Sequence, residues 1–185
     1  MRIVAGEFRS RVIQAVDGNG TRPTTDKIKE AIFSRIGPYF DGGSMLDLFG
    51  GSGNMSLEAI SRGMESALLC DVSAKAIATI QKNCKTLGVM ERCQVWKMDY
   101  KRALRKAADE GLCFDLVYLD PPYRYQQIQS ILEFLDAHDM VSDKGDVVCE
   151  SLKEDVFPDQ IGKLRKVKDV TYGITRITYY KKVSL

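Results

Sequence analysis

Hydrophobic and polar positions alternate along this chain in two recurring patterns. Short apolar runs, typical of buried β-strands, are separated by longer stretches in which apolar residues recur every three or four positions, as on one face of a helix. The strand-like runs cover residues 44–49, 66–70, 93–98, 114–119 and 146–150. Helix-like stretches lie between them at 54–62, 73–87, 100–109 and 125–135. This alternation predicts an α/β fold whose parallel strands are joined by right-handed helical crossovers.

The carboxyl-terminal end follows a different pattern. Residues 164–171 and 174–182 are both β-prone and are joined by Tyr172-Gly173, which predicts an antiparallel hairpin at one end of the sheet. Added to the five earlier strands, this hairpin gives a mostly parallel, seven-stranded sheet.

The amino-terminal end stands apart from the repeating pattern. Residues 2–15 alternate in polarity, with Gly6 near a turn, which predicts a short β-hairpin. A helix is expected to begin near Asp26, capped by one of the two preceding threonines. We therefore divide the chain into an extension, 1–43, and a main domain, 44–185.

Composition narrows the class of protein only modestly. The chain has 185 residues, of which 44% are hydrophobic and 28% charged, with a net charge of +2; these values fit one globular domain and argue against disorder. No apolar run approaches the roughly 20 residues of a membrane span. The five cysteines have no metal-binding spacing, and we expect them to be reduced core residues of a cytoplasmic protein. His138 is the only histidine, which excludes a histidine triad and a three-histidine zinc site.

A glycine-rich segment follows the first strand of the main domain. Glycines let the backbone approach a ligand closely, and the helix that follows presents free N–H groups. The phosphate-binding sequence G-x-x-x-x-G-K-[ST] is absent, and a carboxylate before the loop would repel pyrophosphate. A cationic ligand without phosphate, S-adenosylmethionine, fits better, although a plain tight turn remains an alternative. The residues assigned here to this cofactor are Asp47, Phe49, Gly50, Gly51, Ser52 and Gly53.

Acidic residues recur where the predicted parallel strands end. Ligands of such sheets bind beyond the carboxyl ends of the strands. Asp71 closes the second strand, 24 residues after Asp47, where an acid can receive ribose hydroxyls. Asp99, beside Tyr100, closes the third and is suited to an adenine amino group, or else caps the next helix. With Asp120 after the fourth strand, we expect four acids in register along one sheet edge.

The segment Asp120-Pro121-Pro122-Tyr123 is the most specific feature of the sequence. Two prolines fix φ and remove backbone donors, so carbonyl acceptors remain beside a carboxylate in a stiff turn. An exocyclic amino group of a base is a poor nucleophile. If the carboxylate and a carbonyl accepted hydrogen bonds from its two N–H groups, the nitrogen lone pair would point at a methyl sulfonium. The tyrosine offers a flat face for a base removed from its helix. We therefore assign these four residues to catalysis; the alternative is a rigid turn after a buried strand.

The motifs together resemble one family. Besides the glycine loop and the Leu119-Asp-Pro-Pro-Tyr corner, they are Arg2-Ile-Val-Ala-Gly, Arg9-Ser-Arg11, Thr21-Arg-Pro-Thr-Thr-Asp-Lys-Ile-Lys-Glu-Ala-Ile-Phe and Leu57-Glu-Ala-Ile-Ser-Arg-Gly. Over nearly the whole chain they resemble the RsmD family, bacterial methyltransferases of 16S ribosomal RNA. The resemblance implies a Rossmann-like class I methyltransferase fold, S-adenosylmethionine as cofactor and N2 of one guanine as acceptor. In that family the second strand often ends in Glu rather than Asp71, and Gly50 replaces the more usual alanine, which we expect to be neutral.

The same resemblance makes the extension an RNA-binding element. Its partner would be 16S rRNA in the small ribosomal subunit or an assembly intermediate, with no membrane or metal involved, and the enzyme would be a cytoplasmic monomer. Arginine suits phosphate, and such contacts weaken with salt; ordinary surface arginines are the alternative. Seven basic residues and one acid between Lys163 and Lys182 add a second basic end. The arginines assigned to RNA are Arg2, Arg9, Arg11, Arg22 and Arg62.

Three other functions remain open on the sequence alone. A DNA adenine-N6 methyltransferase can use the same corner, but this chain has no room for a target-recognition domain. A protein-glutamine methyltransferase would favour Asn at position 120. A non-catalytic RNA-binding assembly module could retain the cofactor pocket without the reaction.

Overall fold

The computed structural model describes residues 1–18, 24–122 and 125–184. Within them the chain forms two compact units, Met1–Ala103 and Leu104–Leu185. The units divide the chain inside one helix, well after the boundary at residue 43 expected from sequence. The extension and the first three strands therefore belong to the same compact unit.

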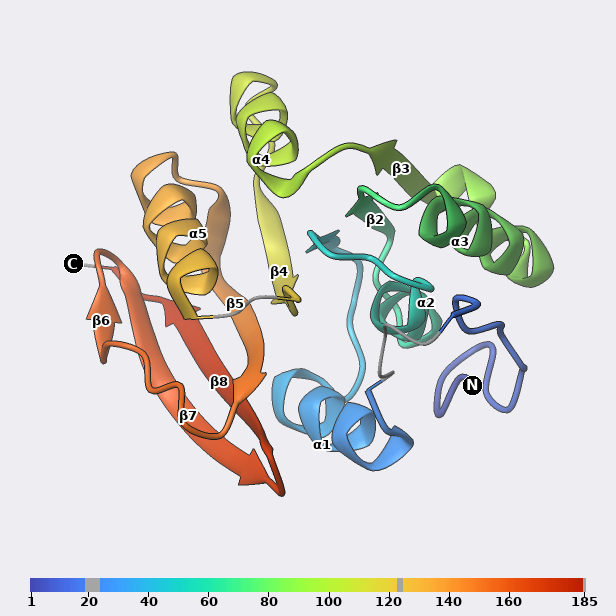
Figure 1. Ribbon diagram of the computed structural model, residues 1–185, viewed down its shortest axis with the longest axis horizontal. Helices are drawn as coiled ribbons and strands as arrows, with labels where there is room; N and C mark the ends of the chain where they lie inside the picture. Colours follow the sequence, from blue (N-terminus) through green and yellow to red (C-terminus); the bar gives the residue numbers. More distant parts are fainter. Residues whose placement is uncertain (19–23, 123–124, 185) are drawn as a thin grey trace. The chain divides into compact units, whose positions relative to one another are not determined.

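The first unit contains a three-stranded parallel sheet in the order β3-β2-β1 (Figure 1). Helices α2 and α3 pack against these strands. Its elements are α1 (Asp26–Ile36), β1 (Ser44–Asp47), α2 (Asn54–Ser61), β2 (Ser66–Asp71), α3 (Ala74–Leu87), a 3-10 turn (Met90–Arg92), β3 (Cys93–Lys97) and the start of α4 (Tyr100–Asp109).

The second unit continues the α/β pattern and ends in antiparallel strands, in the order β4-β5-β8-β7-β6. Strands β4 and β5 are parallel, whereas β8 runs antiparallel to β5 and to β7. Helix α5 packs on β5 and β6, as Figure 1 shows. After α4, its elements are β4 (Phe114–Leu119), α5 (Tyr125–Ala137), β5 (Val141–Leu152), β6 (Gln160–Ile161), β7 (Leu164–Tyr172) and β8 (Thr175–Lys182).

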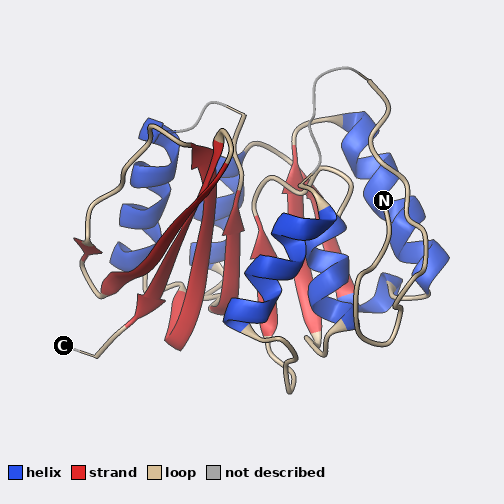
Figure 2. Cartoon of the chain, turned by 90° about the horizontal axis from the view of Figure 1, so that it is seen from below, coloured by secondary structure: helices blue, strands red, loops and turns tan. Residues whose placement is uncertain are grey.

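The expected α/β architecture with a carboxyl-terminal hairpin is confirmed, and Figure 2 shows its helices in blue and its strands in red. Two details differ. Strand β5 has 12 residues rather than the expected five, because it begins at Val141, which pairs with Phe114, and passes through a register shift before Asp146. Strand β6 was not expected, because two residues are too few to show a periodic pattern of apolar positions. Its residues, Gln160 and Ile161, pair with Arg165 and Leu164.

Local signals explain where the helices of the first unit begin and end. The Thr25 hydroxyl accepts a hydrogen bond from the Ile28 N–H at 3.2 Å, and Ser73 caps α3 in the same way. Gly88 ends α3 in the left-handed conformation, which glycine adopts without steric cost. Ile80 and Cys84 on the inner face of α3 are fully buried, as the apolar spacing predicted.

The first 17 residues, here called the N-terminal arm, fold back on themselves without forming regular strands. A single antiparallel bridge joins Arg2 to Val12, supported by bonds from Ile3 N–H to the Arg11 carbonyl and from Ile13 N–H to the Met1 carbonyl, both 2.9 Å. The expected β-hairpin is therefore reduced to one bridge. The arm is nevertheless fixed to the unit, because its two isoleucines are buried in the core.

The cysteines match their expected placement only in part. All five cysteines are free thiols, but Cys113 is exposed, which corrects the assignment of all five to the core. The described residues include no helix long and apolar enough to cross a membrane. They also include no group of three or more His, Cys, Asp or Glu placed to hold a metal ion.

Candidate functional site

The glycine loop connects β1 to α2 and is held by its own backbone. The Gly50 N–H donates to the Cys70 carbonyl at 2.7 Å, and the Gly53 N–H donates to the Gly50 carbonyl at 2.8 Å. Gly51 and Gly53 have φ of +57° and +83°, where side chains are strained. Gly53 immediately precedes the first turn of α2, so free N–H groups of the helix end point out beside the loop.

Gly50 matters for packing rather than for φ. A Cβ at this position would lie 3.0 Å from Ile80 Cδ1 and 3.3 Å from the Cys70 carbonyl oxygen. The loop therefore lies directly on α3 and β2, and an alanine would require the Ile80 side chain to shift. Whether alanine is neutral at this position depends on how easily the Ile80 side chain moves, and the expectation stays a prediction.

Asp71 at the end of β2 binds the loop directly. One carboxylate oxygen accepts the Gly51 N–H at 3.0 Å, and the other accepts the Ser73 N–H at 2.9 Å. This acid therefore fixes the loop and the start of α3 together. Its carboxylate is half-buried, and ribose binding at Asp71 remains a prediction.

Asp47 at the end of β1 lies beneath the loop and is only 2% exposed. The Ser56 hydroxyl donates to it at 2.7 Å. Burial raises the pKa of Asp47 to about 7, and nearby Asp71 adds to the rise, whereas the Ser56 hydrogen bond opposes it. Asp47 is therefore poised between its neutral and charged forms near neutral pH.

Two aromatic residues assigned to the cofactor lie together. The rings of Phe49 in the glycine loop and Tyr100 at the start of α4 have centroids 5.4 Å apart, with planes tilted by 44°.

Asp99 precedes α4 and its carboxylate accepts the Arg102 N–H at 2.9 Å. The capping role considered for Asp99 is thus present, while its side chain remains exposed.

The acids of the first unit are staggered rather than in register. Asp47 pairs with Leu69, two residues before Asp71, and Asp71 pairs with Lys97, two residues before Asp99. Asp71 therefore lies about 6–7 Å further along than Asp47, and Asp99 follows β3 two residues beyond the position opposite Asp71. The expectation of four acids in register is wrong, since the described strands differ in where they end.

The proline corner follows β4 in the second unit. Pro121 is buried, Pro122 is exposed and Asp120 is half-buried, so the turn is anchored on one side and open on the other. Tyr123 lies outside the described residues. Leu119 pairs with Cys149, so Glu150 is the next residue of β5 beside the point where β4 ends. The Glu150 carboxylate accepts a hydrogen bond from the Tyr118 hydroxyl. Sequence analysis did not single out Glu150, because it lies within an apolar strand pattern.

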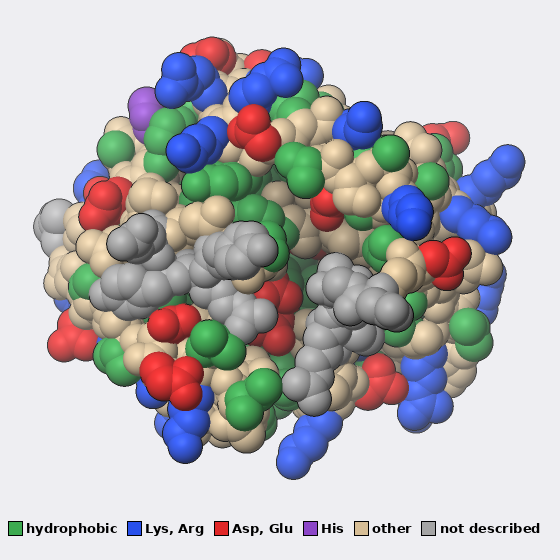
Figure 3. All heavy atoms as spheres, in the orientation of Figure 1, with side chains coloured by type: hydrophobic (Ala, Val, Ile, Leu, Met, Phe, Trp, Pro, Cys, Tyr) green, Lys and Arg blue, Asp and Glu red, His purple; other side chains and the backbone are tan. Residues whose placement is uncertain are grey.

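The arginines assigned to RNA fall into two groups. Arg2, Arg9 and Arg11 of the arm are exposed; Arg2 pairs loosely with Asp26, and Arg11 donates to the Thr86 carbonyl at 2.8 Å. Arg22 lies outside the described residues. Figure 3 shows basic and acidic side chains interspersed on the face that it draws.

The assignment of Arg62 to RNA is wrong. Its side chain is only 1% exposed and is bonded to Glu58 and Glu30, both at 2.8 Å. A third bond reaches the Pro38 carbonyl, and the guanidinium lies 5.0 Å from the centre of the Phe33 ring. The Leu57-Glu-Ala-Ile-Ser-Arg-Gly motif therefore encodes an interior ion network rather than an RNA contact.

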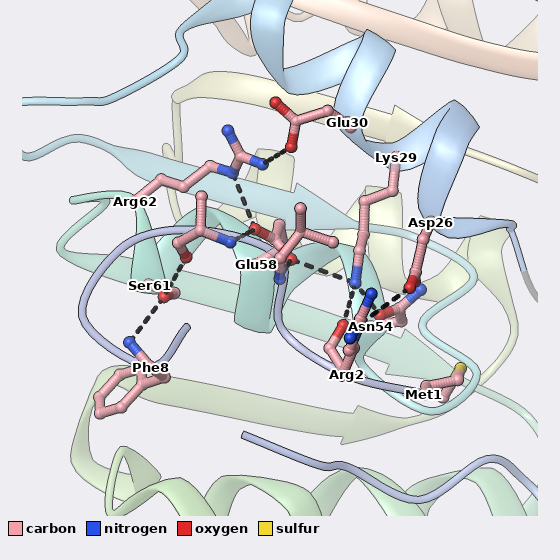
Figure 4. Close-up of polar contacts among 12 residues, drawn as sticks. Met1, Arg2, Phe8, Asp26, Lys29, Glu30, Asn54, Glu58, Ser61 and Arg62 are labelled. Carbon is pink, nitrogen blue, oxygen red and sulfur yellow. Dashed lines mark hydrogen bonds and ion pairs between the residues drawn. The ribbon is translucent and has the colours of Figure 1, made fainter. Parts of the chain in front are cut away.

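That network fixes the N-terminal arm to α2 (Figure 4). Glu58 is fully buried and accepts the Val4 and Ala5 N–H groups at 2.8 and 3.1 Å, besides pairing with Lys29 at 3.1 Å. Ser61 adds a bond from the Phe8 N–H at 2.9 Å. These roles could not be predicted from the sequence, because a lysine and a glutamate on helices normally indicate a solvated face.

Comparison with solved structures defines the class of protein. The chain superposes on "Putative methyltransferase yhhF from Escherichia coli" with a TM-score of 0.86 and 25% identity, covering 100% of this chain and 99% of that one. The fold is that of the class I methyltransferases, as the sequence predicted.

The family follows from sequence comparison. The family described as Conserved hypothetical protein 95 matches residues 1–181. "Putative rRNA methyltransferase YlbH" of Bacillus subtilis is 44% identical over 182 residues, covering 98% of this chain and 99% of the relative. "Ribosomal RNA small subunit methyltransferase D" of Escherichia coli is 29% identical over 158 residues, covering 85% and 78%. The chain belongs to this family, and the resemblance to RsmD drawn from its motifs is confirmed.

Proposed function

We propose that this protein transfers a methyl group from S-adenosylmethionine to the exocyclic N2 of one guanine in 16S ribosomal RNA. The observation that carries the proposal is the combination of the glycine loop with the Asp120-Pro121-Pro122 corner in a class I methyltransferase fold. Relatives named as rRNA methyltransferases, which match the chain over most of its length, support the substrate class.

The first unit fits S-adenosylmethionine. Gly51 and Gly53 keep the loop backbone free of side chains, and the start of α2 offers donors without the cationic residue of a phosphate site. Asp71 and Asp99 supply carboxylates at neighbouring strand ends for ribose hydroxyls and an adenine amino group. Tyr100 and Phe49 supply an apolar contact for the adenine ring. When bound, the cofactor contributes an electrophilic methyl group on sulfur.

The corner is suited to positioning an amino nitrogen. The Asp120 carboxylate and a carbonyl of the proline turn would each accept one N–H of the guanine amino group, which localises the nitrogen lone pair toward the methyl donor. The bound cofactor would supply the methyl group and would leave as the neutral thioether S-adenosylhomocysteine, while one amino proton of the acceptor would pass to solvent. The rate gain comes from orientation and electrostatics, worth several kcal/mol in such sites.

The exposed arginines of the N-terminal arm are proposed to contact RNA phosphates. Arg2, Arg9 and Arg11 remain candidates, and Arg22 is retained from the sequence. We place the reaction in the cytoplasm, where ribosomal subunits are assembled, with a monomer acting on the small subunit or on its assembly intermediate.

A genetic experiment tests the proposed substrate. Nucleosides from 16S rRNA of cells with and without the gene are compared by mass spectrometry. Cells without the gene are expected to lack one N2-methylguanosine per small subunit. The wild-type gene and the control variant Asp109→Ala, at an exposed position, should restore it, whereas Asp120→Ala should not. An unchanged N2-methylguanosine content would refute the guanine assignment.

A further inference from the structure

The glycine loop is connected to the N-terminal arm through the buried side chain of Asn83. Asn83 Nδ2 donates to the Ser52 carbonyl at 2.9 Å and to the Gln14 carbonyl at 2.8 Å. The Gln14 N–H in turn donates to Asn83 Oδ1 at 2.8 Å. Only 1% of Asn83 is exposed. One amide on α3 therefore bridges the arm and the loop.

The orientation of this amide is determined by its partners. A backbone N–H can only donate, so it requires Oδ1, and two carbonyls can only accept, so they require both hydrogens on Nδ2. A flipped amide would lose all three bonds. Leucine or aspartate at position 83 would likewise leave partly buried backbone groups of Gln14 and Ser52 without these bonds, at a cost in free energy.

A second buried side chain makes a similar connection on the other side of Gly53. Lys29 Nζ on α1 donates to Asn54 Oδ1 and to the Arg2 carbonyl, both at 2.7 Å. Figure 4 shows Lys29 pointing from α1 toward Asn54, Arg2 and Glu58. The two residues that flank Gly53, Ser52 and Asn54, are thus both bonded to the arm through interior polar groups.

The two points of attachment on the arm are themselves connected. Arg2 and Gln14 lie on the two segments joined by the bridge between Arg2 and Val12, and the Ile13 N–H bonds to the Met1 carbonyl. A displacement of either segment would therefore be transmitted to the loop. Ordinary packing does not require this arrangement, because apolar side chains would fill the same interior without linking arm and loop.

We infer that Asn83 is a positioning residue that holds the glycine loop in its cofactor-binding conformation through the N-terminal arm. The inference rests on the proposed cofactor, and it adds that S-adenosylmethionine affinity depends on the docked arm. The arm is then part of the cofactor site's support as well as a candidate RNA-binding element.

The test measures the dissociation constant for S-adenosylhomocysteine by isothermal titration calorimetry at a temperature where every variant is folded. Asn83→Ala is expected to weaken binding about tenfold, equivalent to about 1.4 kcal/mol. Gln14→Pro removes the arm N–H that bonds to Asn83, and it also fixes φ at position 14 and restricts Ile13; it is expected to weaken binding several-fold. The double variant is expected to bind no more weakly than Asn83→Ala, because both changes break the same connection.

Thr86→Ala is the matched control, since it removes an exposed side-chain hydrogen bond to the Lys82 carbonyl from the same helix. Its dissociation constant should equal that of the wild type. A lowered melting temperature of Asn83→Ala with wild-type affinity, or additive losses in the double variant, would overturn the inference. Should Asn83→Ala not fold, wild-type affinity in Gln14→Pro overturns it. Failure of the wild type itself to bind S-adenosylhomocysteine would instead refute the proposed cofactor.

Discussion

At the scale of single residues, Asp47 and Glu58 are two interior carboxylates with different surroundings. Asp47 has a hydroxyl partner and an acidic neighbour, whereas Glu58 has two cationic partners and two backbone donors. Interior charge without a cation favours the protonated form, while interior charge with cations is retained. We therefore predict different effects on stability when each of the two acids is replaced by its amide.

The raised pKa of Asp47 predicts a pH-dependent stability. Between pH 4 and 7 the folded state keeps a proton that the unfolded state has lost, so the free energy of unfolding falls as pH rises through this window and is level above it. The contribution is at most about 4 kcal/mol. Asp47→Asn should remove this part of the slope in urea unfolding at pH 4.5 and 7.5. The exposed Asp109→Asn serves as control, and equal slopes in Asp47→Asn and wild type would contradict the assignment.

Glu58→Gln is predicted to destabilise the first unit strongly. The change leaves Lys29 and Arg62 buried without their shared counter-charge, which typically costs about 3–5 kcal/mol. Chemical denaturation measures the loss, and Glu65→Gln, at an exposed position shortly after α2, should change stability by less than about 0.5 kcal/mol. A similar small effect from both variants would show that the ion network does not stabilise the fold.

At the scale of elements, the N-terminal arm depends on one close backbone contact. A Cβ at Gly6 would lie 1.9 Å from the Ser61 carbonyl oxygen, and Gly6 has a φ of +89°. Gly6→Ala should therefore detach the arm from α2 and make it sensitive to limited proteolysis. Gly42→Ala is the matched control, because Gly42 has a φ of +85° but no atom within 4 Å of the added carbon. Equal protease resistance in both variants would contradict this account of docking.

The elements also show what a sequence can and cannot predict. The apolar runs of β1, β2 and β4 and the spaced apolar face of α3 were predictable, because burial imposes their periods. The early start of β5 and the two residues of β6 were not, since they are defined by pairing of Val141 with Phe114 and of β6 with β7 rather than by their own patterns. The arm was predicted as a hairpin because alternation suggests strands, but its pairing stops after one bridge.

The candidate site was predictable in its backbone and less so in its side chains. The glycine loop, Asp71 and the proline corner follow from motifs with direct steric or chemical reasons. Arg62 was misassigned and Asn83 and Lys29 were missed, because their roles depend on contacts between segments 25 to 69 residues apart. No local pattern distinguishes a buried polar bridge from a solvated helix face.

At the scale of the whole molecule, the residues proposed to bind the cofactor and those proposed to hold the acceptor lie in different units. Every residue assigned to S-adenosylmethionine lies within Met1–Ala103, and the described residues of the proline corner lie within Leu104–Leu185. Asp120→Ala should therefore abolish methyl transfer, lowering its rate at least about 100-fold, while leaving S-adenosylhomocysteine affinity unchanged. Calorimetry and a methyl-transfer assay measure the two effects separately, and a parallel loss of both would contradict this division.

The central claim is that the protein methylates guanine N2 in 16S rRNA, and isotope transfer tests it most directly. Purified protein is incubated with S-adenosylmethionine carrying a deuterated methyl group and with small subunits from cells lacking the gene. The account predicts one labelled N2-methylguanosine per subunit, formed by the wild type and not by Asp120→Ala. Label on adenine, or no label on any nucleoside with the wild-type protein, would contradict it.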